Sequence, residues 1–222
     1  METFDWKNAQ RGEIDWWREH QERSNPSMGE GGLKRYPTYM RVFGHSFSQE
    51  SILDVGAGAF PLVNWLGNCA KRVSVDPLNA DFAAAGFARN RNVEYVCGLA
   101  EKLPFADGQF AQVLLLNMLD HLEDWRTAVT EAARVASSSV IIHVHIDGPF
   151  AGDGLHKTLL EEELLELIEG RYNGKRVAFC YPEETRPFWL RCLAGVRRTI
   201  ARKGRGYRIP IEKCWAGIIS RG

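Results

Sequence analysis

The stretch Ile52-Leu53-Asp54-Val55-Gly56-Ala57-Gly58 decides the fold, because a short apolar run passes directly into a glycine turn. This pattern predicts a buried strand that ends in a tight turn and leads into a helix. The two glycines allow backbone conformations, and a close approach of a ligand, that a Cβ atom would obstruct. Pro61 stands where the next helix is expected to begin, and proline is well tolerated in the first turn of a helix.

Outward from this turn, short apolar runs alternate with helical segments, which is typical of βαβ units and a parallel sheet. The continuous run Val113-Leu114-Leu115-Leu116 suits a central strand that is covered on both faces. The expected strands are Ser51–Val55, Arg72–Asp76, Val93–Cys97, Ala111–Leu116, Ser139–Ile146, Arg176–Tyr181 and Cys214–Ser220. The expected helices between and after them are Leu62–Asn68, Asp81–Arg89, Asp124–Val135 and Leu159–Glu169. We therefore predict an α/β fold: a Rossmann-like, doubly wound, seven-stranded sheet, mostly parallel with one antiparallel strand near the C-terminus.

The 222 residues are expected to form a single domain, residues 1–222. Residues 1–47 are interpreted as an N-terminal helical cap, with an aromatic amphipathic helix over the first 24 residues and a short helix from Leu33 to about His45. Trp16 and Trp17 of the first helix either cover the site as a lid or simply pack against the domain. Residues 183–210 are interpreted as a basic insertion between the last two strands.

Composition excludes several classes of protein. Lys plus Arg and Asp plus Glu both number 28, so the net charge gives no global sign of nucleic-acid or membrane binding. The sequence shows no signal-peptide pattern and no apolar stretch long enough to span a bilayer. The five cysteines are scattered without a CxxC pair, which favours a reducing compartment. We expect a cytoplasmic protein.

The second strand ends at Asp76, about 20 residues after the glycine turn, where a carboxylate that binds a ribose diol is expected. A dinucleotide fingerprint would require a third glycine at the position of Pro61. Asp54, two residues before the first glycine, would repel a pyrophosphate but suits a ligand with a cationic amino group. The electrostatics therefore favour S-adenosylmethionine (SAM) over NAD as the ligand.

With these residues, the chain resembles the class I SAM-dependent methyltransferases, especially the ubiquinone/menaquinone-type subgroup. The residues that carry the resemblance are Asp54–Gly58, Val75-Asp76, Gly98–Phe105, Phe110–Leu122, Asp124-Trp125 and Arg134-Val135. The resemblance covers about Ser51 to Ile146. It implies SAM as the cofactor, bound by Asp54, Gly56, Ala57, Gly58, Asp76, Pro77, Leu99, Ala100, Glu101 and Asn117, with the adenine beside Leu99–Glu101.

The chain departs from the pattern at two turns. Phe60 replaces the third glycine that the family often has in its first motif, and Ser137–Ser139 replaces a glycine-rich turn before the fifth strand. A narrower resemblance, to methyltransferases of glycan pathways, rests on Trp16-Trp17, Asp76–Leu78, Asn117–His121 and Gly154–His156. It implies a sugar hydroxyl as the methyl acceptor.

A hydroxyl acceptor benefits from a general base, and ligands of open α/β sheets bind beyond the carboxyl ends of the strands. Asp120 and His121 follow the fourth strand, so we expect this pair to be catalytic, although both residues could instead cap the next helix. His156, after a glycine-rich loop, is the second candidate base. His143 is expected in the core, and His145 nearer to the site. The spacing of these residues is not diagnostic of a metal site, and no metal is predicted.

Eight basic residues and no acidic residue lie between Arg186 and Arg208. This charge suits a small-molecule or glycan acceptor that bears phosphate, an RNA or an anionic lipid surface, or it forms a solvated face. Methyl transfer to a small-molecule or glycan hydroxyl is the preferred function. The alternatives are an RNA-directed methyltransferase and a SAM-binding scaffold subunit without activity. The sequence leaves the oligomeric state open.

Overall fold

The computed structural model describes residues 6–24, 46–146, 159, 161–171, 176–180 and 213–220. Its strands are β1 (Ser51–Val55), β2 (Lys71–Val75), β3 (Glu94–Val96), β4 (Phe110–Leu116), β5 (Ala136–Ile146), β6 (Arg176–Cys180) and β7 (Lys213–Ser220). Its α-helices are α1 (Trp6–Ser24), α3 (Asn79–Ala84), α4 (Trp125–Val135) and α5 (Glu161–Arg171), and η1 (Leu62–Asn64) and η2 (Leu119–His121) are short 3-10 helices. The expected helix from Leu33 to His45 and the basic insertion at 183–210 lie outside the described residues.

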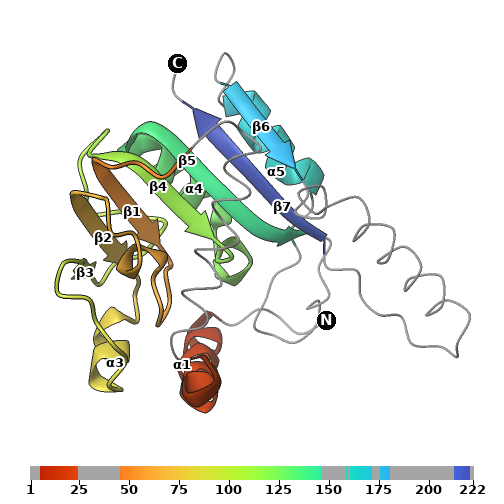
Figure 1. Ribbon diagram of the computed structural model, residues 1–222. Coiled ribbons are helices and arrows are strands. Elements are labelled where there is room, and N and C mark those ends of the chain that lie inside the picture. The colour runs from red at the N-terminus through yellow and green to blue at the C-terminus, as the bar shows by residue number, and fades with distance from the viewer. Residues whose placement is uncertain are drawn as a thin grey trace, which may run out of the picture.

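The five strands β1 to β5 form a parallel sheet in the order β3-β2-β1-β4-β5 (Figure 1). This arrangement confirms the Rossmann-like α/β fold, and β1 and β4 lie at its centre. Beyond β5, β7 pairs with it in the antiparallel direction, and β6 pairs with β7. The first and fourth strands leave the sheet at neighbouring points, because Val55 lies opposite Leu115 in the register.

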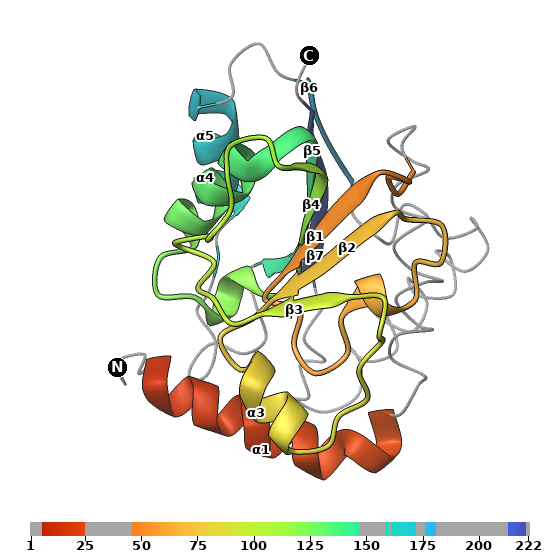
Figure 2. The same cartoon turned by 90° about the vertical axis from the view of Figure 1, so that its left-hand side faces the viewer.

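Helices α4 and α5 cover one face of the sheet (Figure 2). Alternate residues of the strands point to this face, among them Leu53, Val113 and Ile142, and they pack with Val129 of α4 and Ile168 of α5. The opposite face has its own buried cluster, which includes Ile52, Leu62, Val63, Cys69, Val93, Leu114 and Ile141. The central strands β1 and β4 are buried along almost their whole length, as expected for parallel strands that are covered on both faces.

Two predicted helices are shorter in the structure than the sequence suggested. The expected helix at Leu62–Asn68 is the single 3-10 turn η1, and Gly67 and Asn68, which follow it, have low helix propensity. The expected helix at Asp81–Arg89 is α3, which begins two residues earlier at Asn79 and ends before Gly86. Gly86 has a φ of 81°, a left-handed conformation typical of the residue that follows a helix.

Helix α1 lies beyond the carboxyl ends of the parallel strands, next to α3 (Figures 1 and 2). Its residues Ile14 and Trp17 pack against a buried cluster that contains Ala59, Leu78, Phe82 and Phe87. Ligands of open α/β sheets bind at this edge. The first helix is therefore part of the wall around the expected site.

Candidate active site

The turn after β1 has the backbone geometry that the sequence predicts. Gly56 and Gly58 have φ angles of 60° and 62°, a left-handed conformation that disfavours any residue with a Cβ atom. The amide of Gly56 donates to the carbonyl of Val75 at 2.8 Å, and the amide of Gly58 donates to Oδ2 of Asp76 at 2.9 Å. These bonds fix the turn against the end of β2, so the glycines and Asp76 form one unit.

Asp54 lies within the protein behind this turn, with only 2% of its surface exposed. Its Oδ2 accepts a hydrogen bond from the amide of Val63 at 3.3 Å, which joins β1 to η1. Burial raises the pKa of Asp54 to about 7, against the lowering effect of hydrogen bonds from Val63 and Leu62, and the charge of Asp76 adds to the rise. Asp54 therefore lies within the protein and helps to fix the position of the turn relative to η1.

Asp76 is buried directly after β2. Its Oδ1 accepts from the amide of Leu78 at 2.8 Å, and its Oδ2 from the amide of Gly58. Burial raises its pKa to about 6; the two backbone hydrogen bonds oppose this rise, and the carboxylate of Glu13 adds to it. Arg89 lowers the pKa of Asp76 by a smaller amount. Each carboxylate oxygen has two lone pairs, so both oxygens of Asp76 can still accept from a diol.

Two side chains contact the glycines of the turn. A Cβ atom on Gly56 would lie 2.7 Å from Cε of Met118, and a Cβ atom on Gly58 would lie 3.3 Å from Cζ2 of Trp17. The indole of Trp17 also makes an edge contact with Phe60, at 5.5 Å between ring centroids. The absence of a side chain at Gly58 therefore serves both the turn, which has positive φ, and the packing of Trp17 of α1.

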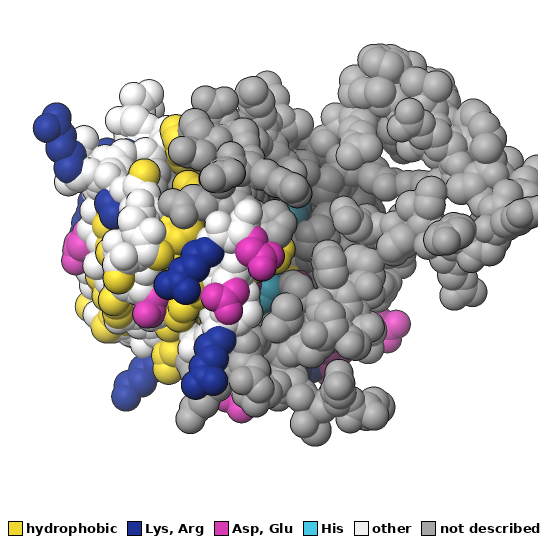
Figure 3. All heavy atoms as spheres, turned by 90° about the horizontal axis from the view of Figure 1, so that it is seen from below, with side chains coloured by type: hydrophobic (Ala, Val, Ile, Leu, Met, Phe, Trp, Pro, Cys, Tyr) yellow, Lys and Arg dark blue, Asp and Glu magenta, His cyan; other side chains and the backbone are white. Residues whose placement is uncertain are grey.

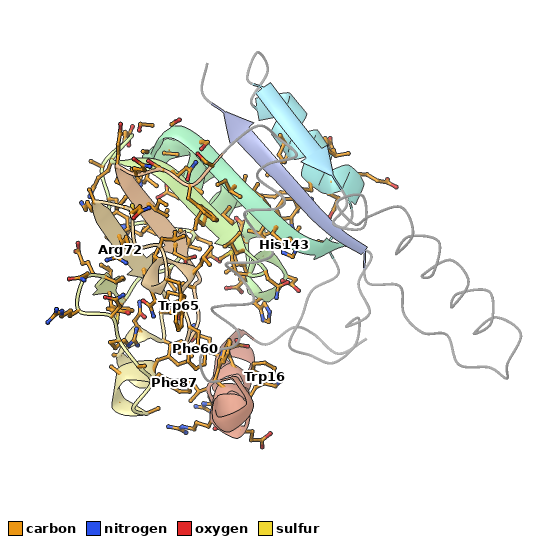
Figure 4. All side chains as sticks on the ribbon, in the orientation of Figure 1. Trp16, Phe60, Trp65, Arg72, Phe87 and His143 are labelled. Carbon is orange, nitrogen blue, oxygen red and sulfur yellow. The ribbon has the colours of Figure 1, made fainter. Side chains whose placement is uncertain are left out.

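Aromatic rings connect α1 to α3 through the residue that replaces the third family glycine. Phe60 contacts Trp17 on one side and Phe87 on the other, and Phe87 contacts Phe82 of α3. Figure 4 shows Phe60 and Phe87 between the two helices and Trp16 on α1. Phe60 therefore docks the first helix, which gives this departure from the family pattern a physical role.

The pair Asp120 and His121 lies in η2, directly after β4. Asp120 is 3% exposed, and its Oδ1 accepts no hydrogen bond from the described residues. The Nε2 atom of His121 lies 3.9 Å from this oxygen. Met118, one turn earlier, packs on Gly56, so the structure brings the predicted base close to the glycine turn.

Glu13 of α1 faces the other nitrogen of the imidazole, and the sequence analysis missed it. Its Oε2 lies 3.9 Å from Nδ1 of His121, and its Oε1 accepts from the indole N–H of Trp17 at 2.7 Å. Glu13 and Trp17 are four residues apart and share one face of the helix. Because Trp17 was one of the residues expected to cover the site, this spacing could have predicted that Glu13 lies near it as well.

Asn117, at the end of β4, has a φ of 57° and is the only non-glycine residue with positive φ in the described segments. Its amide donates to the carbonyl of His143 at 2.6 Å. Non-glycine residues in this conformation are uncommon and cluster at functional sites. The side chain of Asn117 is exposed at the edge where the ligand is expected.

The remaining predicted cofactor residues differ in exposure. Leu99 is 42% exposed and Ala100 is buried, while Ala57, Pro77 and Glu101 are partly exposed. The carboxyl ends of β2 and β3 are joined by a hydrogen bond from the amide of Asp76 to the carbonyl of Val96 at 3.1 Å. Leu99–Glu101 therefore follows a strand that ends beside the expected ribose carboxylate.

The other histidines contribute less to the described site. His156 lies outside the described residues, as does the side chain of His145. His143 is buried in β5, in agreement with its prediction as a core residue (Figure 4). Among the residues that the structure describes, no group of three metal-ligating side chains comes together.

Seen from the α1 side, acidic and basic side chains are interspersed with hydrophobic ones on the described surface (Figure 3).

Within the described ranges, no helix is both long and apolar enough to cross a bilayer.

Comparison with known proteins agrees with this geometry. The methyltransferase domain family matches residues 53–143, which contain the glycine turn, Asp76 and the pair Asp120 and His121. None of the curated proteins matches the sequence significantly.

Solved structures share the fold at low sequence identity. The YcgJ protein from Bacillus subtilis is 17% identical, with a TM-score of 0.54 over 82% of this chain and 96% of that one. The plantazolicin methyltransferase BamL, solved with a desmethylplantazolicin analogue and S-adenosylhomocysteine (SAH), is 12% identical, with a TM-score of 0.61 over 96% and 91%. A SAM-dependent methyltransferase from Thermotoga maritima is 15% identical, with a TM-score of 0.52 over 93% and 98%.

The domain match and the fold indicate the same class of protein. Residues 53–143 match a methyltransferase domain, and the fold is shared with solved methyltransferases.

Proposed function

We propose that this enzyme transfers the methyl group of SAM to a hydroxyl group of a small molecule or glycan. The observation that carries the proposal is the position of His121: it follows β4 at the carboxyl edge of the sheet and lies between two carboxylates, Asp120 and Glu13. A hydroxyl loses a proton when it is methylated, and a histidine beside a carboxylate is suited to accept it near neutral pH.

The residues around the glycine turn fit the cofactor. Two left-handed glycines bring the backbone close to a ligand, and Asp76 keeps lone pairs for the two ribose hydroxyls. We infer that Gly56, Ala57 and Gly58 contact the methionine part of SAM. The adenine of SAM is expected to lie beside Pro77, between Leu99, Ala100 and Glu101. The negative charge of Asp54 complements the cationic ammonium group, and Asn117 lies at the end of β4 between cofactor and acceptor.

When bound, SAM supplies an electrophilic methyl group on a positively charged sulfur. With SAM held at the glycine turn and Asp76, this methyl group would be transferred to the acceptor oxygen, and the hydroxyl proton would pass to the imidazole of His121. Asp120 holds the ring, and α1 excludes water from the edge of the sheet through Trp17. Alignment of the reacting atoms supplies most of the acceleration in such displacements.

Further assignments belong to this proposal. His156 is the second candidate for the base, from the segment after β5. The basic residues at 183–210 suit a phosphate-bearing acceptor. We assign helix α1, the described part of residues 1–47, to the cap of a single domain in a cytoplasmic enzyme, and the glycan-pathway resemblance favours a sugar acceptor.

Titration calorimetry with SAM and, separately, with NAD tests the cofactor first. We expect SAM to bind in the micromolar range and NAD not to bind. Transfer of a labelled methyl group is then measured with sugars, nucleotide sugars and RNA as acceptors. Labelling of RNA alone would favour the RNA-directed enzyme, and strong SAM binding without transfer to any acceptor would favour the scaffold subunit.

The base is tested with His121→Ala and His156→Ala. We expect His121→Ala to lower the rate about 100-fold or more at neutral pH, the usual contribution of a general base. Rates that stay unchanged at every pH in both variants would contradict the assignment.

A further inference from the structure

Helix α1 brings a second carboxylate, Glu13, to His121, in addition to that of Asp120. The Oε2 atom of Glu13 lies 3.9 Å from Nδ1 of His121, while its Oε1 accepts from the indole N–H of Trp17 at 2.7 Å. The Glu13 side chain is 34% exposed and the His121 side chain 28%, so the pair lies at the rim of the site. Trp17 is itself seated on Gly58. The carboxylate is therefore held in place from the glycine turn.

The two nitrogens of His121 face two different acids. Asp120 from η2 is at Nε2 and Glu13 from α1 is at Nδ1, each with 3.9 Å between the nearest atoms. A neutral imidazole has one N–H group, whereas the protonated ring has two. The buried Oδ1 of Asp120 accepts no hydrogen bond from the described residues, so it is the carboxylate that gains most from an N–H group. The protonated ring can therefore present one N–H group towards each carboxylate.

We propose that Glu13 is a positioning residue for His121: its carboxylate, held by Trp17, orients the imidazole and stabilises its protonated form. The inference rests on the proposed function, in which His121 takes the proton of the acceptor. The O–H bond of the acceptor breaks, an N–H bond forms on the imidazole, and the positive charge of the ring arises with Nδ1 3.9 Å from the carboxylate of Glu13. The first helix thus completes the catalytic arrangement as well as covering the cofactor.

Glu13→Gln is the test, because a glutamine oxygen can still accept from the indole of Trp17 while the charge is lost. Glu19→Gln, an exposed position on the same helix, is the matched control. The measurement is the ¹⁵N NMR spectrum of the His121 ring, assigned by its loss in His121→Asn, which reports the ratio of protonated to neutral imidazole at pH 6. We expect Glu13→Gln to lower this ratio about two- to fivefold, as for a partly exposed ion pair, and Glu19→Gln to leave it unchanged.

Glu13→Ala separates the charge from the docking of the helix, because it removes both the charge and the acceptor for Trp17. A His121 spectrum that changes in Glu13→Ala but not in Glu13→Gln would assign Glu13 to helix docking alone and overturn the proposal. Titration calorimetry of SAH binding to the same proteins distinguishes the failure of the proposed function from the failure of the role of Glu13. Absence of SAH binding to the wild-type protein would count against the proposed function, whereas normal binding with a His121 spectrum insensitive to the charge would refute only the role of Glu13.

Discussion

Replacement of Asp54 by asparagine is expected to stabilise the protein at alkaline pH and to change its stability little at acidic pH. Burial raises the pKa of Asp54 from 3.8 to about 7. The folded protein therefore keeps the proton on this group over a pH range in which the unfolded chain has released it. The free energy of unfolding of the wild-type protein consequently falls as the pH rises from about 4 to about 7.

The magnitude follows from the size of the pKa rise. From 3.8 to about 7 is about 3 units, or about 4 kcal/mol at 1.36 kcal/mol per unit, and this is an upper limit because Asp76 contributes to the rise. The amide oxygen of asparagine can still accept from Val63. We expect Asp54→Asn to raise the free energy of unfolding by about 1–4 kcal/mol at pH 8 and by less than about 1 kcal/mol at pH 4.

Urea denaturation at pH 4, 6 and 8 measures this difference, with Asp81→Asn, an exposed carboxylate of α3, as the control for the loss of one negative charge. We expect the same Asp54→Asn protein to bind SAM about 10- to 100-fold more weakly, as for the loss of a buried charged partner. A change in stability that is the same at pH 4 and pH 8 would refute the reasoning, because it could not come from the ionisation of Asp54.

Two further changes test the turn and the segment after β3. Gly58→Ala is expected to destabilise the protein more than Gly86→Ala in thermal unfolding. Both positions have positive φ and share a backbone strain of about 1 kcal/mol, but only at Gly58 would a Cβ atom lie 3.3 Å from Trp17. Equal losses of stability in the two variants would show that Trp17 does not pack on Gly58. Arg134→Lys is expected to lower the free energy of unfolding by about 1–2 kcal/mol in urea, because Arg134 donates to Glu131, Asp107 and two carbonyls of the segment after β3. Arg126→Lys, at an exposed ion pair, is the control, with an expected change below about 0.5 kcal/mol.

The sequence by itself determined the five-stranded parallel sheet and the turn that follows its first strand. Apolar runs of strand length, separated by helical segments, leave few arrangements in which every apolar face is covered. The positive φ angles of Gly56 and Gly58 and the position of Asp76 after β2 follow from chemistry that lies within a few residues of each motif. Because these features are local or periodic, they can be read before any contact is known.

Local signals were less informative where tertiary contacts decide the outcome. The helix predicted from Pro61 is only the short η1, and Asp54 is tied to it through Val63. The left-handed conformation of Asn117 is one that asparagine adopts more readily than other non-glycine residues, but its hydrogen bond to the carbonyl of His143 in β5 is a tertiary contact that the sequence does not show.

Only the tertiary structure placed Glu13 beside His121 and Trp17 on Gly58. The periodicity of α1 shows which residues share a face of the helix, but not what that face covers. The partner of Glu13 is more than 100 residues away along the chain. Contacts at this separation depend on how whole elements pack against one another, here through the rings of Trp17, Phe60 and Phe87, and no short-range pattern encodes that packing.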